Sequence, residues 1–219
     1  MDLRARRRAA TMRHVQTVAL DLFERHGYDA VPVARVAAAA EVAERTVYRH
    51  FGTKESLALH DDADAAFLAD VVTRTGQVGV ARAVHAALDA QPEQTWDAAG
   101  AVTRDWLRKL RLMRSTPALR AAAERMTSQL GDTLGAAEAA AGVEPFVARA
   151  RCRAVAAALT VAVEEWADGD GRQDLPALVR TATDAVVGLA ATTLPPGPAA
   201  PTGPVAGERS AQSRGSGTA

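Results

Sequence analysis

Residues 33–54 read VARVAAAAEVAERTVYRHFGTK, and this stretch decides how the rest of the chain is interpreted. Its first part carries apolar residues on one face of a short helix, namely Val33, Val36, Ala37 and Ala40. Its second part predicts another short helix from about Glu44 to Phe51, in which Val47 and Phe51 point inward. Two short helices joined by three or four residues are typical of a helix-turn-helix.

The second of these helices leaves a row of polar side chains on its outer side. That row consists of Arg45, Thr46, Arg49 and His50. Arginine can bond guanine edges and phosphates, threonine can contact a thymine methyl, and the hydroxyl of Tyr48 can reach a phosphate. A purely structural pair of helices would show the same apolar spacing, but would need no such row.

Further residues stand at the spacings of a known signature. They are Phe23, Gly27-Tyr28, Val36-Ala37, Ala40, Val42, Thr46, Tyr48, Phe51, Lys54-Glu55 and Leu57. Over roughly residues 11–60 this pattern resembles the TetR family of repressors. The resemblance implies a helix-turn-helix head followed by a helical body, and a phosphate contact by Lys54. The predicted DNA-binding residues are Arg35, Glu44, Arg45, Thr46, Tyr48, Arg49, His50 and Lys54.

Four positions depart from the family pattern. Pro32 stands where the family usually has threonine, and Glu41 replaces the usual turn glycine. Ala43 replaces a capping serine, and Arg45 replaces another glycine. The fold tolerates these changes, but the operator sequence cannot be transferred from a relative.

Charge and composition fit a head on a separate body. Lysine and arginine number 26 in total, as do aspartate and glutamate, yet residues 1–54 carry a net +4 and the remainder a net −4. Alanine is abundant and no alternating apolar pattern persists, which predicts an all-α fold of about nine helices. No apolar stretch of membrane-spanning length and no signal peptide is evident, so we expect a cytoplasmic protein without a membrane partner.

We expect three regions: a DNA-binding head with a basic arm (1–53), a helical ligand-binding and dimerisation body (54–194), and a disordered Pro/Gly-rich tail (195–219). The basic arm, residues 1–10, is either frayed and solvated or in contact with DNA. Beyond it, helices are expected at about 9–26, 54–75, 78–90, 95–114, 118–141, 145–167 and 174–192.

The last two helices carry small residues on their apolar sides, which lets helices approach closely. They can pack only within their own body, or join those of a second copy in a four-helix bundle. The TetR resemblance implies the latter, a homodimer through about 145–167 and 174–192. Trp166 after Glu164-Glu165, followed by a DL-x-x-LV helix, is also loosely similar to the actinobacterial mycofactocin-regulator subgroup.

The resemblance also implies an effector pocket in the body. Its candidate lining is Phe67, Trp96, Trp106, Leu110, Met113 and Trp166. Side chains of this kind can equally form plain core. Arg108 and Arg111 lie near the Trp106 face, where they would either neutralise an anionic ligand group or remain solvated.

No motif for catalysis or metal binding is recognisable, so we expect no enzyme activity, no metal and no cofactor. Cys152 is interpreted as a small buried residue, with a thiol redox sensor as the alternative. The favoured function is a ligand-responsive repressor that a small apolar or amphipathic molecule releases from double-stranded operator DNA. The alternative is a dimeric small-molecule binding protein whose head no longer reads DNA.

Overall fold

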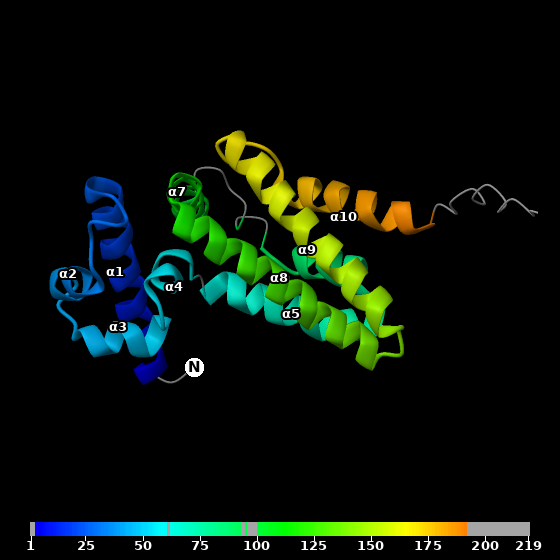
Figure 1. Cartoon of the computed structure of the whole chain (residues 1–219), viewed down its shortest axis with the longest axis horizontal. Helices are drawn as coiled ribbons and strands as arrows, with labels where there is room; N and C mark the ends of the chain where they lie inside the picture. The colour runs from blue at the N-terminus through cyan, green and yellow to red at the C-terminus, as the bar shows by residue number, and fades with distance from the viewer. Residues whose placement is uncertain (1–2, 61, 93–94, 96–99, 192–219) are drawn as a thin grey trace, which may run out of the picture.

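The computed structural model describes residues 3–60, 62–92, 95 and 100–191, and every regular element in these ranges is a helix (Figure 1). The head contains α1 (Leu3–His26), α2 (Val33–Ala39), α3 (Glu44–Phe51) and α4 (Lys54–Leu59). The body contains α5 (Asp62–Val78), α6 (Val80–Asp89), α7 (Ala101–Ser115), α8 (Pro117–Ala140), α9 (Pro145–Asp168) and α10 (Leu175–Ala191). The all-α prediction is confirmed, with ten helices in the described ranges instead of about nine.

The head is organised around α1, whose apolar stripe forms the centre of a small core. Val15, Ala19 and Phe23 of α1 are almost completely buried, in one cluster with the apolar residues of α2, α3 and α4. Gly27, at φ 82, turns the chain out of α1, and its N–H bonds the carbonyl of Phe23 at 2.9 Å as part of this helix end. Tyr28 then packs into the core with its ring 5.0 Å from that of Phe23.

α1 begins earlier than the sequence pattern indicates. We expected a start at about Ala9 after a basic arm, whereas the helix already includes Leu3. Arg7 and Arg8 are therefore exposed residues of a helix. The physical reason is that arginine and alanine both favour helix, so nothing in this segment stops α1 from extending outward.

The single helix expected over residues 54–75 is wrong, because the chain breaks at His60. His60 adopts an extended backbone (φ −61, ψ 139), which separates α4 from α5. The break lets each helix face its own core: Leu57 and Ala58 belong to the head cluster, and Val71 of α5 belongs to the body cluster. One straight helix could not bury Leu57 in the head core and Val71 in the body core at the same time. At its far end, α5 continues through Gly76, and Gly79, at φ 82, starts α6.

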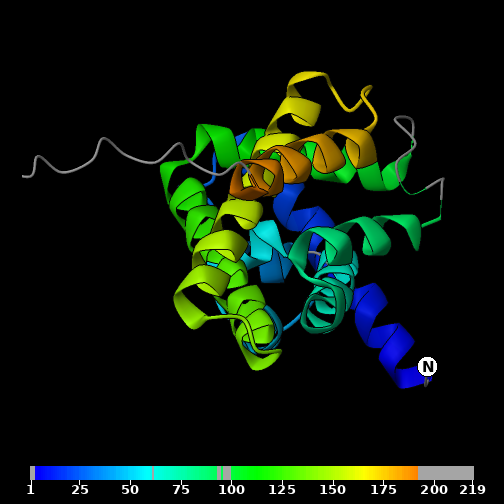
Figure 2. The same ribbon diagram turned by 90° about the vertical axis from the view of Figure 1, so that its right-hand side faces the viewer.

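The body is built on two antiparallel helices of 24 residues, α8 and α9, with α10 against α9 (Figures 1 and 2). Two glycines of α8 allow the close approach of α9. A Cβ on Gly131 would lie 2.8 Å from the Cα of Arg153, and one on Gly135 would lie 2.9 Å from the Cα of Arg149.

Glu138 ties three body helices together although its side chain is almost completely buried. Its carboxylate accepts hydrogen bonds from the backbone N–H of Val80 at 2.9 Å and from the guanidinium of Arg151, with Nε at 3.0 Å. It therefore provides an acceptor at the start of α6 and links α8 to α9. A buried carboxylate is tolerated here because it has both a charged partner and a backbone donor.

Head and body meet between α1 and α7. Arg108 of α7 donates to Asp21 at 2.5 Å and to the two carboxylate oxygens of Glu24 at 2.8 and 2.7 Å, both on α1. Leu112 and Leu119 of the body enter the head cluster. A hollow of about 690 Å³ opens beside this contact, lined by the end of α1, the loop that follows it, the end of α7 and the start of α8. Arg108 thus joins the two parts and also lines this hollow.

Among the described residues, none of the helices combines the length and apolar character needed to cross a membrane. The tail predicted to be disordered begins at residue 195, outside the described ranges.

Candidate nucleic-acid interface

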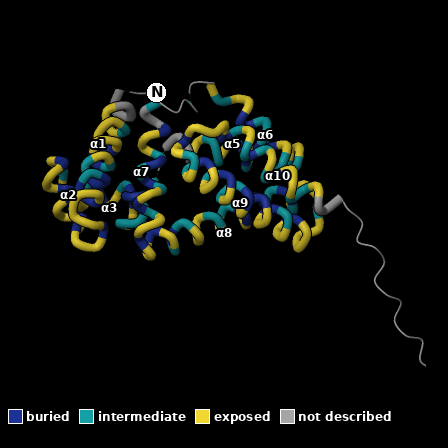
Figure 3. Tube along the Cα trace, turned by 90° about the horizontal axis from the view of Figure 1, so that it is seen from above, coloured by how far each residue is buried: buried dark blue, intermediate teal, exposed yellow. Residues whose placement is uncertain are grey.

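The helix α3 separates its buried and exposed sides as its sequence pattern predicts. Val47 is 1% exposed and Phe51 is 7% exposed, so these two residues anchor the helix on the head core. Glu44, Arg45, Tyr48 and Arg49 are exposed on the opposite side, and Figure 3 shows the head surface around α2 and α3 as largely exposed. This side presents two cations, a carboxylate and a phenolic hydroxyl to solvent, all of which can form hydrogen bonds to DNA.

The outer row predicted from the sequence is only partly outward. Thr46 and His50 are half-buried. The His50 ring packs edge-on against Phe51, with centroids 4.6 Å apart, and lies 5.8 Å from the ring of His60. In a short helix the residues beside the buried face still contact neighbouring elements. His50 is such a residue, and it contacts His60 at the end of α4.

The turn between α2 and α3 is made by a residue that carries a side chain. Glu41 has φ 56, in the left-handed region that favours glycine. The N–H of Val42 bonds the carbonyl of Ala37 at 3.0 Å, which closes the turn. α2 and α3 begin after Pro32 and Ala43, neither of which forms a side-chain cap. The helix-turn-helix therefore forms from packing and from backbone hydrogen bonds, without the usual glycine and hydroxyls.

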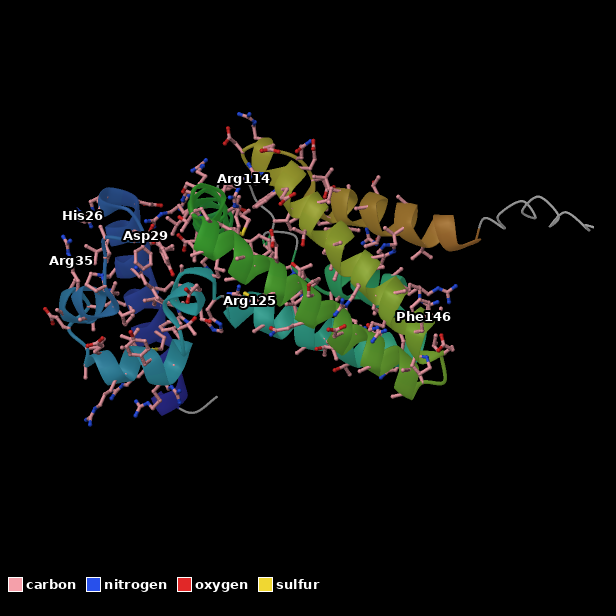
Figure 4. All side chains as sticks on the ribbon, in the orientation of Figure 1. His26, Asp29, Arg35, Arg114, Arg125 and Phe146 are labelled. Carbon is pink, nitrogen blue, oxygen red and sulfur yellow. The ribbon has the colours of Figure 1, made fainter. Side chains whose placement is uncertain are left out.

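Arg35 is exposed on α2, one position away from the buried Val36. Its Nη2 lies 3.1 Å from Nε2 of His26, at the end of α1. Figure 4 shows the two side chains together at the outer edge of the head. This pair holds the Arg35 side chain on the same face of the molecule as the loop that follows α1.

Lys54 does not extend freely into solvent. Its Nζ donates to the carbonyl oxygen of Tyr28 at 2.6 Å, and it lies 4.1 Å from the centre of the Tyr28 ring and 5.6 Å from that of Phe23. Partial burial lowers the pKa of Lys54, although Asp29 and Glu55 nearby act in the opposite direction. Burial also raises the pKa of the Tyr28 hydroxyl, which therefore stays protonated.

The residues that form this head match a known family. The N-terminal domain of the tetR family of bacterial regulatory proteins matches residues 17–60, from the middle of α1 to the end of α4. The chain carries a TetR-family domain. Its helices α2 and α3 form the helix-turn-helix of that domain.

A curated relative is similar over part of the chain. The chain is 40% identical, over 52 residues, to a protein described as a mycofactocin biosynthesis transcriptional regulator, MftR, of Mycobacterium tuberculosis (strain ATCC 25618 / H37Rv). The match covers 24% of this chain and 26% of the relative, so the chain spans about a quarter of the length of the relative it matches. The similarity expected around Trp166 stays a prediction.

Two solved structures were found in a comparison of folds. One, described as a TetR-family transcriptional regulator from Mesorhizobium loti MAFF303099, has 19% identity and a TM-score of 0.42, covering 84% of this chain and 98% of that chain. The other, the TetR-family regulator PfmR from Thermus thermophilus, has 21% identity and a TM-score of 0.40, covering 78% and 96%.

The residues expected to line an effector pocket do not all meet. Phe67, Trp106, Leu110 and Trp166 pack in or against the body core, with the two tryptophan rings edge-on and 6.0 Å apart. Met113 packs against the head core instead. Trp96 lies outside the described residues. The pocket therefore stays a prediction, and its candidate lining divides between two cores.

Two other features bear on chemistry. Within the described residues, no group of three or more His, Cys, Asp or Glu side chains could hold a metal ion. The turn at Asp168–Gly171 is a tight turn with Asp170 at φ 52 and Gly171 at φ 72. The side chains of Asp168 and Asp170 bind arginines of α7: Arg114 at 2.5 Å and Arg111 at 3.3 Å.

Proposed function

We propose that the chain is a ligand-responsive transcriptional repressor that binds operator DNA as a homodimer. The observation that carries this proposal is the two-sided character of α3. Val47 and Phe51 hold the helix on the core, while Arg45, Tyr48 and Arg49 remain exposed. A surface helix of a TetR-family domain with this arrangement fits the major groove, where side chains can read base edges.

The polar residues of α3 take different roles according to their place along the helix. The N-terminal residues of a recognition helix reach the base edges, so Glu44, Arg45 and Thr46 read sequence. Tyr48, Arg49 and His50 lie one turn further on and contact phosphates. Arg35 on α2 contacts a phosphate of the same strand segment.

The second recognition helix comes from a second copy of the chain, and the two copies pair through their bodies. α9 exposes an apolar row along its outer side that includes Ala150, Ala154, Ala157 and Val161, and Val161 is 60% exposed. α10 lies beside α9 and exposes Ala177, Ala185 and Gly188. Two such helices from each protomer can bury these rows in a four-helix bundle. The homodimer through α9 and α10 is part of this proposal. So is the domain division, which we place after α4 and not at residue 53, because Leu57 and Ala58 of α4 pack in the head core.

An effector in the body would act through the contact between head and body. Because Arg108 of α7 holds Asp21 and Glu24 of α1, a shift of α7 moves the head. A ligand that binds better to the shifted arrangement would draw the two recognition helices out of register with their half-sites. A small apolar or amphipathic molecule suits the aromatic lining expected around Trp106 and Trp166.

The test compares DNA binding by variants of α3. We expect Arg45→Ala to relax sequence preference at one position of DNA selected by the wild-type protein, with binding weaker by roughly 1–3 kcal/mol. Arg49→Met should weaken binding to all duplexes and reduce the slope of log K against log salt by about 0.9 for each phosphate that the variant no longer neutralises. Equal binding of every duplex by the wild-type protein would instead favour a small-molecule binding protein that does not read DNA.

A further inference from the structure

The first residue of α3 is an exposed carboxylate, Glu44, at the end of the helix that reads sequence in the proposed function. Val47 and Phe51, which anchor the helix on the core, both follow it. The carboxylate therefore lies ahead of the buried part of the helix. Residues at the N-terminal end of a recognition helix are the ones that contact base edges in the major groove. The chemistry of Glu44 thus bears on which bases the head selects.

The head itself gives this carboxylate no partner. Within the part of the chain that the structure describes, the Glu44 side chain forms no hydrogen bond and no ion pair. Glu144, just before α9, is the contrasting case, because its carboxylate accepts from the N–H groups of Phe146 at 3.0 Å and Val147 at 2.8 Å. Glu144 caps its own helix, whereas Glu44 serves α3 only through a negative charge near the positive end of the helix dipole.

Next to this carboxylate, α3 carries two cations on its outermost face. Arg45 and Arg49 are both exposed and four residues apart, so their side chains are neighbours along the helix. Like charges at this spacing disfavour a helix, and neither guanidinium has an acidic partner among the described residues. A polyanion outside the protein explains such a pair. It does not explain a carboxylate at the same end of the helix, because phosphates repel a carboxylate.

Base edges offer the partner that phosphates cannot provide. An ionised carboxylate only accepts hydrogen bonds, and in the major groove only cytosine and adenine present an amino donor. Adenine places the acceptor N7 beside its amino group, whereas cytosine presents its N4 amino group without an acceptor on the same base. Guanine and thymine present acceptor atoms, which repel a carboxylate. Cytosine is therefore the base that suits Glu44 best.

We propose that Glu44 is a specificity-determining residue, which selects cytosine at one position of each half-site by accepting a hydrogen bond from the N4 amino group, beside a guanine bound by Arg45. The inference rests on the proposed function, and it adds the class of operator: half-sites with a cytosine and a guanine under the start of α3. On any other duplex the carboxylate is unpaired and faces phosphates. Glu44 thus raises specificity by lowering affinity for other sequences.

The experiment exchanges the carboxylate for an amide in Glu44→Gln. The side chain keeps its size, loses its charge and gains a donor, and an amide matches the N7 acceptor and N6 donor of adenine. Glu41→Gln is the matched control, because Glu41 is an exposed carboxylate in the turn just before α3 and its replacement removes the same charge. Urea unfolding checks that both variants remain folded.

Each protein selects DNA from a random pool, and fluorescence anisotropy then compares the selected wild-type duplex with one in which adenine replaces the cytosine in both half-sites. We expect the wild type to enrich cytosine and to bind the cytosine duplex at least about tenfold more tightly. Glu44→Gln should enrich adenine at that position and reverse the preference, whereas Glu41→Gln should keep it. Both variants should bind a scrambled duplex more tightly than the wild type, because each removes a carboxylate near phosphates.

A cytosine preference that Glu44→Gln leaves intact overturns the proposal and leaves the proposed function in place, since Glu44 would then act only on the helix dipole. A wild-type site without the cytosine has the same consequence. Equal loss of the preference in Glu41→Gln also overturns the proposal, because the effect would then come from charge alone. A wild-type pool without any enrichment overturns the proposed function, and this proposal with it.

Discussion

At the scale of single residues, Glu41 is the clearest departure from what its backbone favours. It makes the helix-turn-helix turn at φ 56, where a Cβ costs roughly 1–2 kcal/mol in the left-handed region. The residue is exposed, so no buried contact of its side chain offsets this cost. The turn persists because Val36, Ala37 and Val47 on either side are packed in the head core.

Glu41→Gly should therefore stabilise the protein. The relief of left-handed strain exceeds the extra backbone entropy that glycine loses on folding, for a net gain of roughly 0.5–1 kcal/mol in the free energy of unfolding. Urea denaturation at a fixed protein concentration measures it. Ala38→Gly, in the right-handed α2 helix three residues earlier, is the control and should lower stability by a similar amount. A loss of stability in Glu41→Gly would show that the turn is not strained.

Cys152 provides a residue-scale prediction on pH. Its side chain is completely buried, and burial together with the negative charge of Glu138 raises the pKa of the thiol to about 12. Because the pKa is raised, the reactive thiolate is scarce at every pH below that value. We expect a thiol-specific reagent at pH 8 to label the native protein only as fast as it unfolds, and to label it at once in urea. Rapid labelling of the native protein would revive the redox-sensor interpretation.

Residue roles that depend on local sequence could be predicted, and those that depend on distant partners could not. The inward positions Val47 and Phe51, the Thr53 cap and the Gly27 helix end follow from spacing and backbone preference. The Arg108 contact with Asp21 and Glu24 joins residues 87 and 84 positions apart, and no local pattern signals such a pair. The contact between Lys54 and Tyr28 is only weakly indicated by the sequence. Both residues belong to the family signature, but their spacing does not show that they lie together.

At the scale of elements, the contact between α8 and α9 depends on two glycines one turn apart. Gly131 and Gly135 leave room for the α9 backbone, and the Glu138–Arg151 pair lies one turn further along. Such an approach is possible only where no side chain projects, because helix axes otherwise stay about 8–10 Å apart. The packing of the body thus depends on residues that contribute no side chain at all.

Gly131→Ala should destabilise the protein although alanine is the better helix former. The added Cβ would lie 2.8 Å from the Cα of Arg153, and backbone atoms there cannot rotate away. Overpacking of this kind costs about 1–3 kcal/mol, against about 1 kcal/mol gained in helix propensity. Thermal unfolding should therefore show a lower Tm. Ser128→Ala, at an exposed position on the same helix, should leave Tm almost unchanged.

Helix positions were mostly predictable, because glycine, proline and capping residues mark their ends. Proline at the start of α9 and Gly142 after α8 fall where the sequence places them. The division between α4 and α5 was missed because residues 54–75 contain no proline and no glycine. What ends α4 is tertiary: Leu57 and Val71 are buried in different cores, and the chain must turn at His60 to satisfy both.

At the scale of the whole molecule, the account requires two copies. A single α3 contacts only one half-site, and the spacing of two recognition helices is what selects an operator. In the proposed mechanism, the exposed apolar row on α9 is the surface for pairing, and the ion pair of Arg108 with α1 would transmit changes in the body to the head.

Val161→Glu should therefore separate the dimer. The new carboxylate would be buried against the partner's apolar row, and burial of an unpaired charge is costly enough to prevent association. Analytical ultracentrifugation should give a dimer for the wild type and a monomer for the variant, which remains folded by circular dichroism. Glu124→Gln, on an exposed position of α8, is the control and should remain dimeric. A wild-type monomer at micromolar concentration would contradict this part of the account.

The most direct test of the central claim is selection of DNA from a random pool by the wild-type protein, followed by sequencing. The account predicts enrichment of a two-fold symmetric site, with half-sites separated by about one helical turn or a multiple of it. It further predicts that Arg45→Ala loses preference at one position in each half-site. A pool without enrichment, or a preference that Arg45→Ala leaves intact, would contradict the claim that α3 reads DNA.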